Sequence, residues 1–103
     1  MDDYSDGRFT WNTEKAIVNE KKHGVSFEEA SKVFDDPNHH LDFDEEHSDD
    51  EDRFIIIGYS KKPRLLIVCH CYRDDGDAIR IFSARKADIH ERKRYERRRL
   101  GLE

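Results

Sequence analysis

The sequence contains no apolar run near the roughly 20 residues that a membrane-spanning helix needs. Its acidic first residues have none of the basic and apolar regions of a signal peptide, and neither repeats nor low-complexity linkers occur. Cysteine is scarce as well, because Cys69 and Cys71 lie two positions apart in the most apolar segment, where a disulfide would close a small, strained loop. These absences argue against a membrane-spanning or disulfide-stabilised protein and predict a cytoplasmic one with reduced cysteines.

The length fits one domain, residues 1–103, with a single sheet and helices packed on it, and is too short for two independent cores. Charged residues make up 42% of the chain and hydrophobic residues 35%, so the core must be thin. The apolar residues concentrate in residues 54–57, 65–69 and 79–82. These short runs predict strands rather than long helices.

Charge is distributed unevenly along a chain whose net charge is -5. Residues 80–103 contain nine Lys/Arg and four Asp/Glu, which predicts a local binding site for a polyanion. Residues 35–52 contain ten Asp/Glu and no Lys or Arg, and this segment keeps the protein soluble, offsets the basic end or docks a basic partner. The acidic segment also contains His39, His40 and His47, but their spacing matches no metal-binding loop, so no metal site is predicted.

Two helices are predicted near the N-terminus. Asn12 is the expected N-cap of the first, over residues 13–23. Ser26 and Glu29 have the spacing of a capping box, which predicts that a second helix starts immediately afterwards. That helix should end before Pro37, because the residue preceding a proline disfavours helical geometry.

The remaining elements are strands and one last helix. The first two long strands are apolar on both faces, so the N-terminal helices must cover one face and the C-terminal helix or a partner the other. Asp88 caps this basic C-terminal helix, which should run to about residue 99. The pattern predicts an α+β fold of order β-α-α-β-β-β-α with a small, mainly antiparallel sheet. Its strands are expected at residues 8–11, 53–59, 64–72 and 78–84.

An ordered series of motifs covers residues 9–96. It includes Phe9-Thr10-Trp11-Asn12, Lys22-His23-Gly24-Val25-Ser26-Phe27-Glu28-Glu29-Ala30, His47-Ser48, Glu51-Asp52-Arg53-Phe54, Arg80-Ile81-Phe82-Ser83-Ala84-Arg85-Lys86-Ala87 and Glu91-Arg92-Lys93-Arg94-Tyr95-Glu96. Taken together, these motifs resemble the BrnT family of type II toxins. The resemblance implies a RelE-like fold, a toxin that cleaves RNA and arrests growth, and no cofactor. It also implies neutralisation by a BrnA-like antitoxin, whose complex with the toxin binds promoter DNA.

Three arginines are the leading candidates for the chemistry that such a toxin needs. RNA carries its own nucleophile, the 2'-hydroxyl, so no metal is required and the protein must orient this group, stabilise developing negative charge and move protons. Arg53, Arg80 and Arg85 fit the second task, because a guanidinium can bind two phosphate oxygens and stays charged. Each could instead be a solvated strand-end residue or pair with an acid. Glu51 could hold Arg53 or act as a base.

His23 is the predicted proton-transfer residue, because histidine is the usual general acid or base at neutral pH. Its alternative role is to interact with the C-terminal dipole of the first helix. Lys22 and Ser83 are expected to contact the substrate. Tyr95 could stack on an RNA base or anchor the last helix, while His70 is more simply a structural residue within a strand.

Three functions remain open on the sequence. The first is the metal-independent endoribonuclease toxin that the resemblance implies. The second is a non-catalytic module of the same fold that binds RNA or protein. The third is an interaction protein that acts through the acidic residues 35–52.

Overall fold

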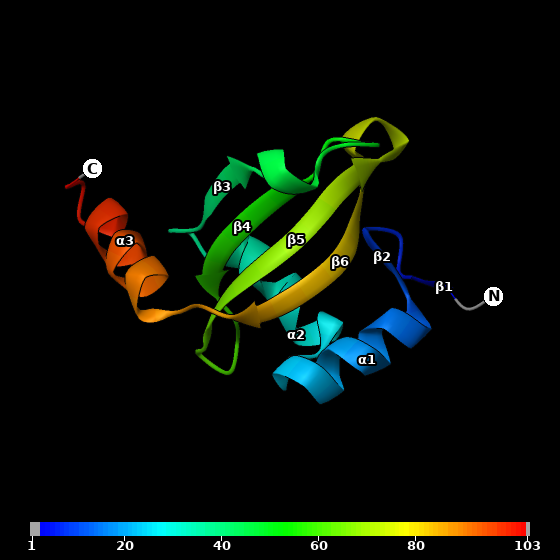
Figure 1. Cartoon of the computed structure of the whole chain (residues 1–103), viewed down its shortest axis with the longest axis horizontal. Coiled ribbons are helices and arrows are strands. Elements are labelled where there is room, and N and C mark those ends of the chain that lie inside the picture. The colour runs from blue at the N-terminus through cyan, green and yellow to red at the C-terminus, as the bar shows by residue number, and fades with distance from the viewer. Residues whose placement is uncertain (1–2, 103) are drawn as a thin grey trace.

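The computed structural model describes residues 3–102. These residues form a six-stranded sheet with three α-helices packed around it (Figure 1). The strand order is β1-β2-β6-β5-β4-β3, and every pair is antiparallel except β2 with β6. This arrangement confirms the predicted α+β fold with a mainly antiparallel sheet. The elements are β1 (Asp3–Ser5), β2 (Phe9–Asn12), α1 (Thr13–His23), α2 (Phe27–Ser31), β3 (His40–Phe43), β4 (Phe54–Tyr59), β5 (Leu65–Arg73), β6 (Ala78–Lys86) and α3 (Ile89–Arg99).

The first helix forms where the sequence predicts it, over residues 13–23. The Asn12 side chain accepts a hydrogen bond from the Lys15 backbone N–H at 2.9 Å, which satisfies one of the free donors of the first turn. Gly24 ends the helix with a φ of +70°, a left-handed conformation that glycine adopts without strain. Local cap chemistry therefore fixes both ends of α1.

The second helix is shorter than predicted. It ends after five residues, and a 3-10 turn, η1 (Lys32–Asp35), continues it. Ser26 Oγ accepts from the Glu29 backbone N–H at 3.0 Å, as an N-cap should. The Glu29 carboxylate does not complete the predicted capping box and binds Arg64 instead. The ion pair of the buried Glu29 carboxylate with the Arg64 guanidinium thus replaces the local hydrogen bond to the Ser26 backbone that the capping box predicts.

Two strands were not predicted. Residues 35–52, where no strand was predicted, contain β3, which pairs with β4 and places Leu41 opposite Ile56. A 3-10 turn, η2 (Glu45–His47), follows it. The other addition is β1, which pairs with β2 at the opposite edge of the sheet. Both are short edge strands with mostly exposed side chains, so their sequences carry little of the apolar signal of a strand.

The helices α1 and α2 and the turn η1 cover one face of the sheet. The turn η1 packs so closely on β4 that a Cβ at Gly58 would lie 3.0 Å from Val33 Cγ1 and 3.1 Å from an Asp36 oxygen. This contact explains a glycine inside an apolar strand. The core on this face is formed by residues that include Phe9, Trp11, Val25, Phe27, Ala30, Val33, Ile56, Leu66, Val68, Ile79, Ile81 and Ala84.

The second face of the sheet is covered only at one end, by α3. Tyr95 of α3 is 1% exposed and packs on Ile57, Leu65 and Ile67. Its hydroxyl donates to Asp36 Oδ2 at 2.7 Å, which ties the helix to η1. Figure 1 shows α3 at one end of the sheet, away from α1. No helix within residues 3–102 has the length and apolar character needed to cross a bilayer.

His70, on β5, should make stability depend on pH. Its neutral ring can donate to the Val68 carbonyl at 3.1 Å and accept from the Tyr72 hydroxyl at 3.3 Å, and burial lowers its pKa to about 4. An unfolded histidine binds a proton near pH 6.5, so acidification from 6.5 to 4 should lower the free energy of unfolding by roughly 3 kcal/mol. Urea denaturation at stepped pH measures this fall. The His70→Phe variant should show a flatter dependence, and an unchanged slope would refute the assignment to His70.

Candidate active site

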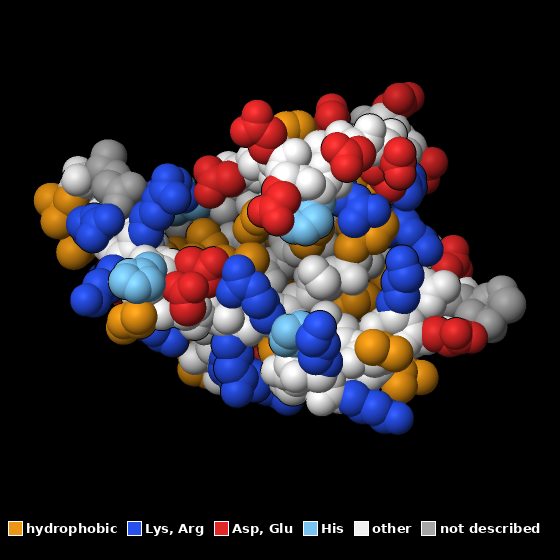
Figure 2. Space-filling model, in the orientation of Figure 1, with side chains coloured by type: hydrophobic (Ala, Val, Ile, Leu, Met, Phe, Trp, Pro, Cys, Tyr) orange, Lys and Arg blue, Asp and Glu red, His pale blue; other side chains and the backbone are white. Residues whose placement is uncertain are grey.

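The open middle of the second face contains a hollow of about 350 Å³. Strands β4, β5 and β6 form its floor, α1 lies on one side and the segment after β3 on the other. In Figure 2, which views this face, basic side chains lie around the hollow, and acidic side chains gather above it. Its polar lining residues are Lys15, Asp44, His47, Arg53, Cys69, Ser83 and Arg85.

A β-bulge in β6 shapes the floor of the hollow. Cys69 of β5 pairs with Ser83, and His70 pairs with Ile81, which leaves Phe82 without a partner opposite it. A bulge interrupts the alternation of side chains along a strand. Phe82 and Ser83, although adjacent in sequence, therefore both line the hollow.

Two of the three predicted arginines line this hollow. The Cζ atom of Arg53 lies 4.0 Å from the centroid of the Phe82 ring, a cation–π contact that holds the guanidinium over the floor. Arg85 pairs with Glu91 of α3 through two N–O contacts of 2.8 Å. This pairing raises the pKa of Arg85 and lowers the pKa of Glu91. The side chains of both arginines are therefore held at defined positions, and Arg85 remains 43% exposed.

His47 and Asp44 form a pair that sequence analysis did not propose as catalytic. Nδ1 of His47 lies 2.8 Å from Oδ2 of Asp44, and the Asp44 side chain is 7% exposed while that of His47 is 57% exposed. Ser48 fixes the turn between them, because its Oγ donates to the Asp44 carbonyl at 2.5 Å and accepts from the Arg53 N–H at 2.9 Å. A buried carboxylate thus orients the imidazole, whose side chain stays more than half exposed.

The spacing of Asp44 and His47 is the signal that could have identified this pair. In a 3-10 turn, residues three positions apart lie directly above one another. Sequence analysis had considered His47 together with His39 and His40 as a metal site. His39 instead contacts the Asp36 carbonyl at 2.7 Å, and within residues 3–102 no group of three or more His, Cys, Asp or Glu side chains is placed so that it could hold a metal ion.

Arg80 and Glu51, two of the predicted site residues outside the hollow, are each held in an ion pair. Arg80 pairs with Asp3 of β1 at 3.1 Å, which is the acid-paired role that the sequence left open for it. Glu51 does not hold Arg53 as expected but pairs with Arg73, at the end of β5, and this hydrogen bond lowers the pKa of Glu51. Neither residue could be placed from sequence alone, because β1 was not predicted and Arg73 lies beyond the strand expected at residues 64–72.

The other predicted residues divide into three placements. Ser83 is exposed on the floor of the hollow. Lys22 and His23 line a second, adjoining hollow beside α1. Tyr95 is buried and hydrogen-bonded to Asp36, so it anchors α3 and offers no ring face on which an RNA base could stack.

Comparisons with known proteins address the family and the fold of the chain. Residues 11–91 match the family described as ribonuclease toxin, BrnT, of type II toxin-antitoxin system. The fold is similar to the 1.1 Å crystal structure of the Brucella abortus ribonuclease toxin BrnT, with a TM-score of 0.55 and 20% sequence identity over 76% of this chain and 92% of that one. No curated protein matches the sequence. Because the family match spans most of the chain, the chain belongs to the BrnT family of ribonuclease toxins of type II toxin-antitoxin systems.

Proposed function

We propose that this toxin is an endoribonuclease that cleaves RNA without a metal ion, in the hollow lined by His47, Arg53 and Arg85. The observation that carries the proposal is the His47–Asp44 pair at the same hollow as two positioned guanidiniums. This set supplies a proton acceptor and two stabilisers of negative charge. Cleavage of RNA by its own 2'-hydroxyl requires both.

In the proposed reaction, Nε2 of His47 accepts the proton of the 2'-hydroxyl, and the 2'-oxygen forms a bond to phosphorus. The bond from phosphorus to the 5'-oxygen breaks, and the 5'-oxygen takes a proton from solvent. The products are a 2',3'-cyclic phosphate and a 5'-hydroxyl. Asp44 keeps the imidazole oriented and stabilises its protonated form, as a buried carboxylate beside histidine can. Arg53 and Arg85 bind the phosphate oxygens that gain charge in the transition state.

Incubation of the purified toxin with an RNA oligonucleotide and EDTA tests this mechanism. We expect cleavage at an unchanged rate, with 2',3'-cyclic phosphate ends detected by mass spectrometry. An oligonucleotide with 2'-deoxyribose at the cleavage position should remain intact, because it lacks the nucleophile. Loss of a reproducible activity on chelation would refute the metal-free mechanism, and absence of any cleavage would favour the non-catalytic binding module.

The arginines should differ in their effect on cleavage. We expect Arg53→Ala and Arg85→Ala each to lower kcat/KM by about 100-fold, as removal of a transition-state hydrogen-bond donor does. Arg80→Ala is the matched control on the same strand. It should lower kcat/KM by less than about tenfold, because Arg80 pairs with Asp3 and does not line the hollow. Circular dichroism and thermal melting verify the fold of each variant. Equal losses for Arg80→Ala and Arg85→Ala would contradict the assigned hollow.

We also propose that a BrnA-like antitoxin neutralises the toxin by covering this open face. The apolar side chains of Ile89, at the start of α3, and Leu100, just after its end, are 57% and 61% exposed, and this helix packs on one end of the sheet. Free toxin would cleave RNA in the cytoplasm and arrest growth, while the complex binds promoter DNA. Coexpression with the antitoxin should yield a complex without ribonuclease activity and with hydrogen-exchange protection in residues 79–99. Protection confined to residues 35–52 would instead place the partner on the acidic segment.

A further inference from the structure

A second hollow, of about 490 Å³, adjoins the proposed cleavage site. It runs beside α1 and shares Lys15, Phe82 and Ser83 with the first hollow, so the two form one continuous groove across the open face. Its further lining residues include Val18, Lys22 and His23 of α1. A polymer bound over Ser83 can therefore occupy both hollows.

The exposed side of α1 has the chemistry of a nucleic-acid contact. Lys15, Val18 and Lys22 follow one another at intervals of three and four residues, which places them on one side of the helix. The two lysines are separated by about 10.5 Å along the helix axis, equivalent to about three nucleotides of a stacked strand. Val18 between them is 62% exposed and lines the hollow, so its apolar side chain is open to a ligand.

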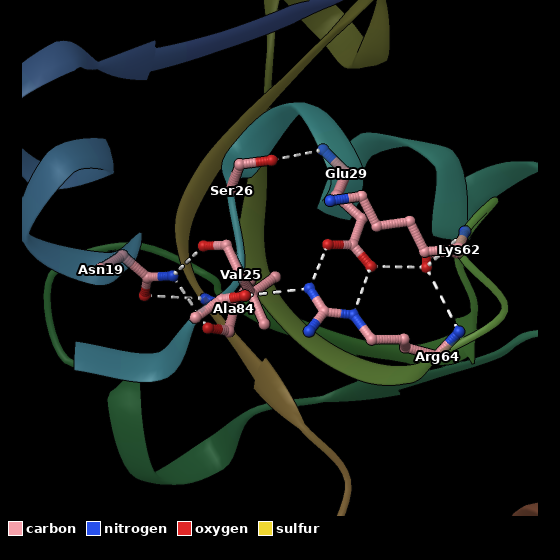
Figure 3. A network of polar contacts seen from close by, with 9 residues as sticks. Asn19, Val25, Ser26, Glu29, Lys62, Arg64 and Ala84 are labelled. Atoms are coloured by element: carbon pink, nitrogen blue, oxygen red, sulfur yellow. Dashed lines mark hydrogen bonds and ion pairs between the residues drawn. The ribbon is translucent and has the colours of Figure 1, made fainter. Parts of the chain in front are cut away.

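The wall formed by α1 is fixed to the sheet, so the groove exists before any ligand binds. The Asn19 side chain accepts from the Ala84 N–H at 3.1 Å and donates to the Ala84 carbonyl at 2.9 Å, in the manner of an added strand. It also donates to the Val25 carbonyl at 3.0 Å. Figure 3 shows this amide between α1, the following turn and β6. A fixed wall lowers the entropy lost on binding.

We infer that this second hollow binds nucleotides that flank the cleaved phosphate of a single-stranded RNA. Lys15 and Lys22 contact phosphates, while Val18 and Phe82 present apolar surface to an unstacked base, which duplex RNA does not offer. His23 then acts in substrate binding rather than in proton transfer, because it lines the second hollow and not the first. The inference rests on the proposed ribonuclease function and assigns its substrate as an unpaired strand longer than a dinucleotide.

Oligonucleotides with a single ribose at the cleavage position test the inference. A dinucleotide substrate and versions extended by three deoxynucleotides on either side are compared by kcat/KM. We expect Lys22→Ala to remove on the order of tenfold from one extended substrate and to leave the dinucleotide unchanged, since the lost contact is one charged hydrogen bond outside the cleavage site. Lys21→Ala is the matched control, because its exposed side chain does not line the hollow.

A binding measurement separates failure of this inference from failure of the proposed function. Fluorescence anisotropy with a single-stranded RNA blocked by 2'-O-methyl at the cleavage position reports affinity without catalysis. For Lys22→Ala, the slope of log K against log salt concentration should become shallower by about 0.7, the value for one lost phosphate contact. Equal affinities and slopes for Lys21→Ala and Lys22→Ala would overturn the inference, and so would a loss of antitoxin binding without a loss of RNA binding.

Discussion

Replacement of His47 by alanine is expected to lower the rate of RNA cleavage by about 100- to 10,000-fold, the range typical of a lost general base. The His47 side chain is largely exposed and makes one side-chain hydrogen bond, to Asp44, so its removal should leave the fold intact. Single-turnover kinetics with a saturating amount of toxin isolate the chemical step. The RNA affinity of the variant should remain close to that of the wild type, because the phosphate-binding arginines are unchanged.

Two companion variants make this result specific to the His47–Asp44 pair. His39→Ala removes an exposed histidine from the same acidic segment, and should retain full activity because its ring contacts the Asp36 carbonyl and does not line the hollow. Asp44→Asn should reduce the rate less than His47→Ala, since the base stays but loses its orienting carboxylate. Its fold must be verified by thermal melting, because Asp44 is buried. Full activity of His47→Ala would remove this histidine from the mechanism and return His23 to consideration.

The contrast between His23 and His47 shows what sequence alone could predict. Caps and turns are local, so the bounds of α1 and the start of α3 follow from Asn12, Gly24 and Asp88. The role of His47 depends on β3, an edge strand that brings the acidic segment beside β5. The residues next to His47 in the sequence are mostly acidic, a pattern typical of a solvent-exposed charged segment. Only the pairing of β3 with β4 shows that Asp44 and His47 of this acidic segment lie at the hollow.

The positions of Arg80 and Arg85 also depend on strand pairing, although the sequence correctly predicted the strand that contains them. Residues five positions apart should lie on opposite faces of a regular strand, because side chains alternate. Ile79 and Ile81 lie in the core, so a regular strand would also turn Arg85 toward the core. The bulge at Phe82 shifts the alternation by one residue, which places Ala84 in the core and Arg85 on the open face. A bulge depends on the register of the partner strand. Sequence could therefore propose both arginines but could not rank them.

Replacement of Arg64 by alanine should have the largest effect on stability, lowering the free energy of unfolding by about 3–5 kcal/mol. Glu29, whose side chain is 4% exposed, pairs with both Nε and Nη2 of Arg64 and accepts from the Ser60 hydroxyl at 2.7 Å. Arg64 Nη2 also donates to the Gly24 carbonyl at 2.9 Å. Figure 3 shows this network joining the turn between the first two helices to the turn between β4 and β5. Without the guanidinium, a buried carboxylate has lost its counter-charge.

Acid should reduce the difference in the free energy of unfolding between the wild type and Arg64→Ala. The hydrogen bond from Arg64 lowers the pKa of Glu29 in the folded wild type, so the stability contributed by the pair is present above pH 4.5 and is lost as pH falls through the lowered pKa. In the variant, the unpaired carboxylate binds a proton more readily, which relieves its burial cost. Urea denaturation at pH 7 and pH 4 measures both values. Lys62→Ala, which removes an exposed neighbouring cation, should change stability by less than about 0.5 kcal/mol, and a loss as large as that of Arg64→Ala would assign the effect to general charge rather than to this pair.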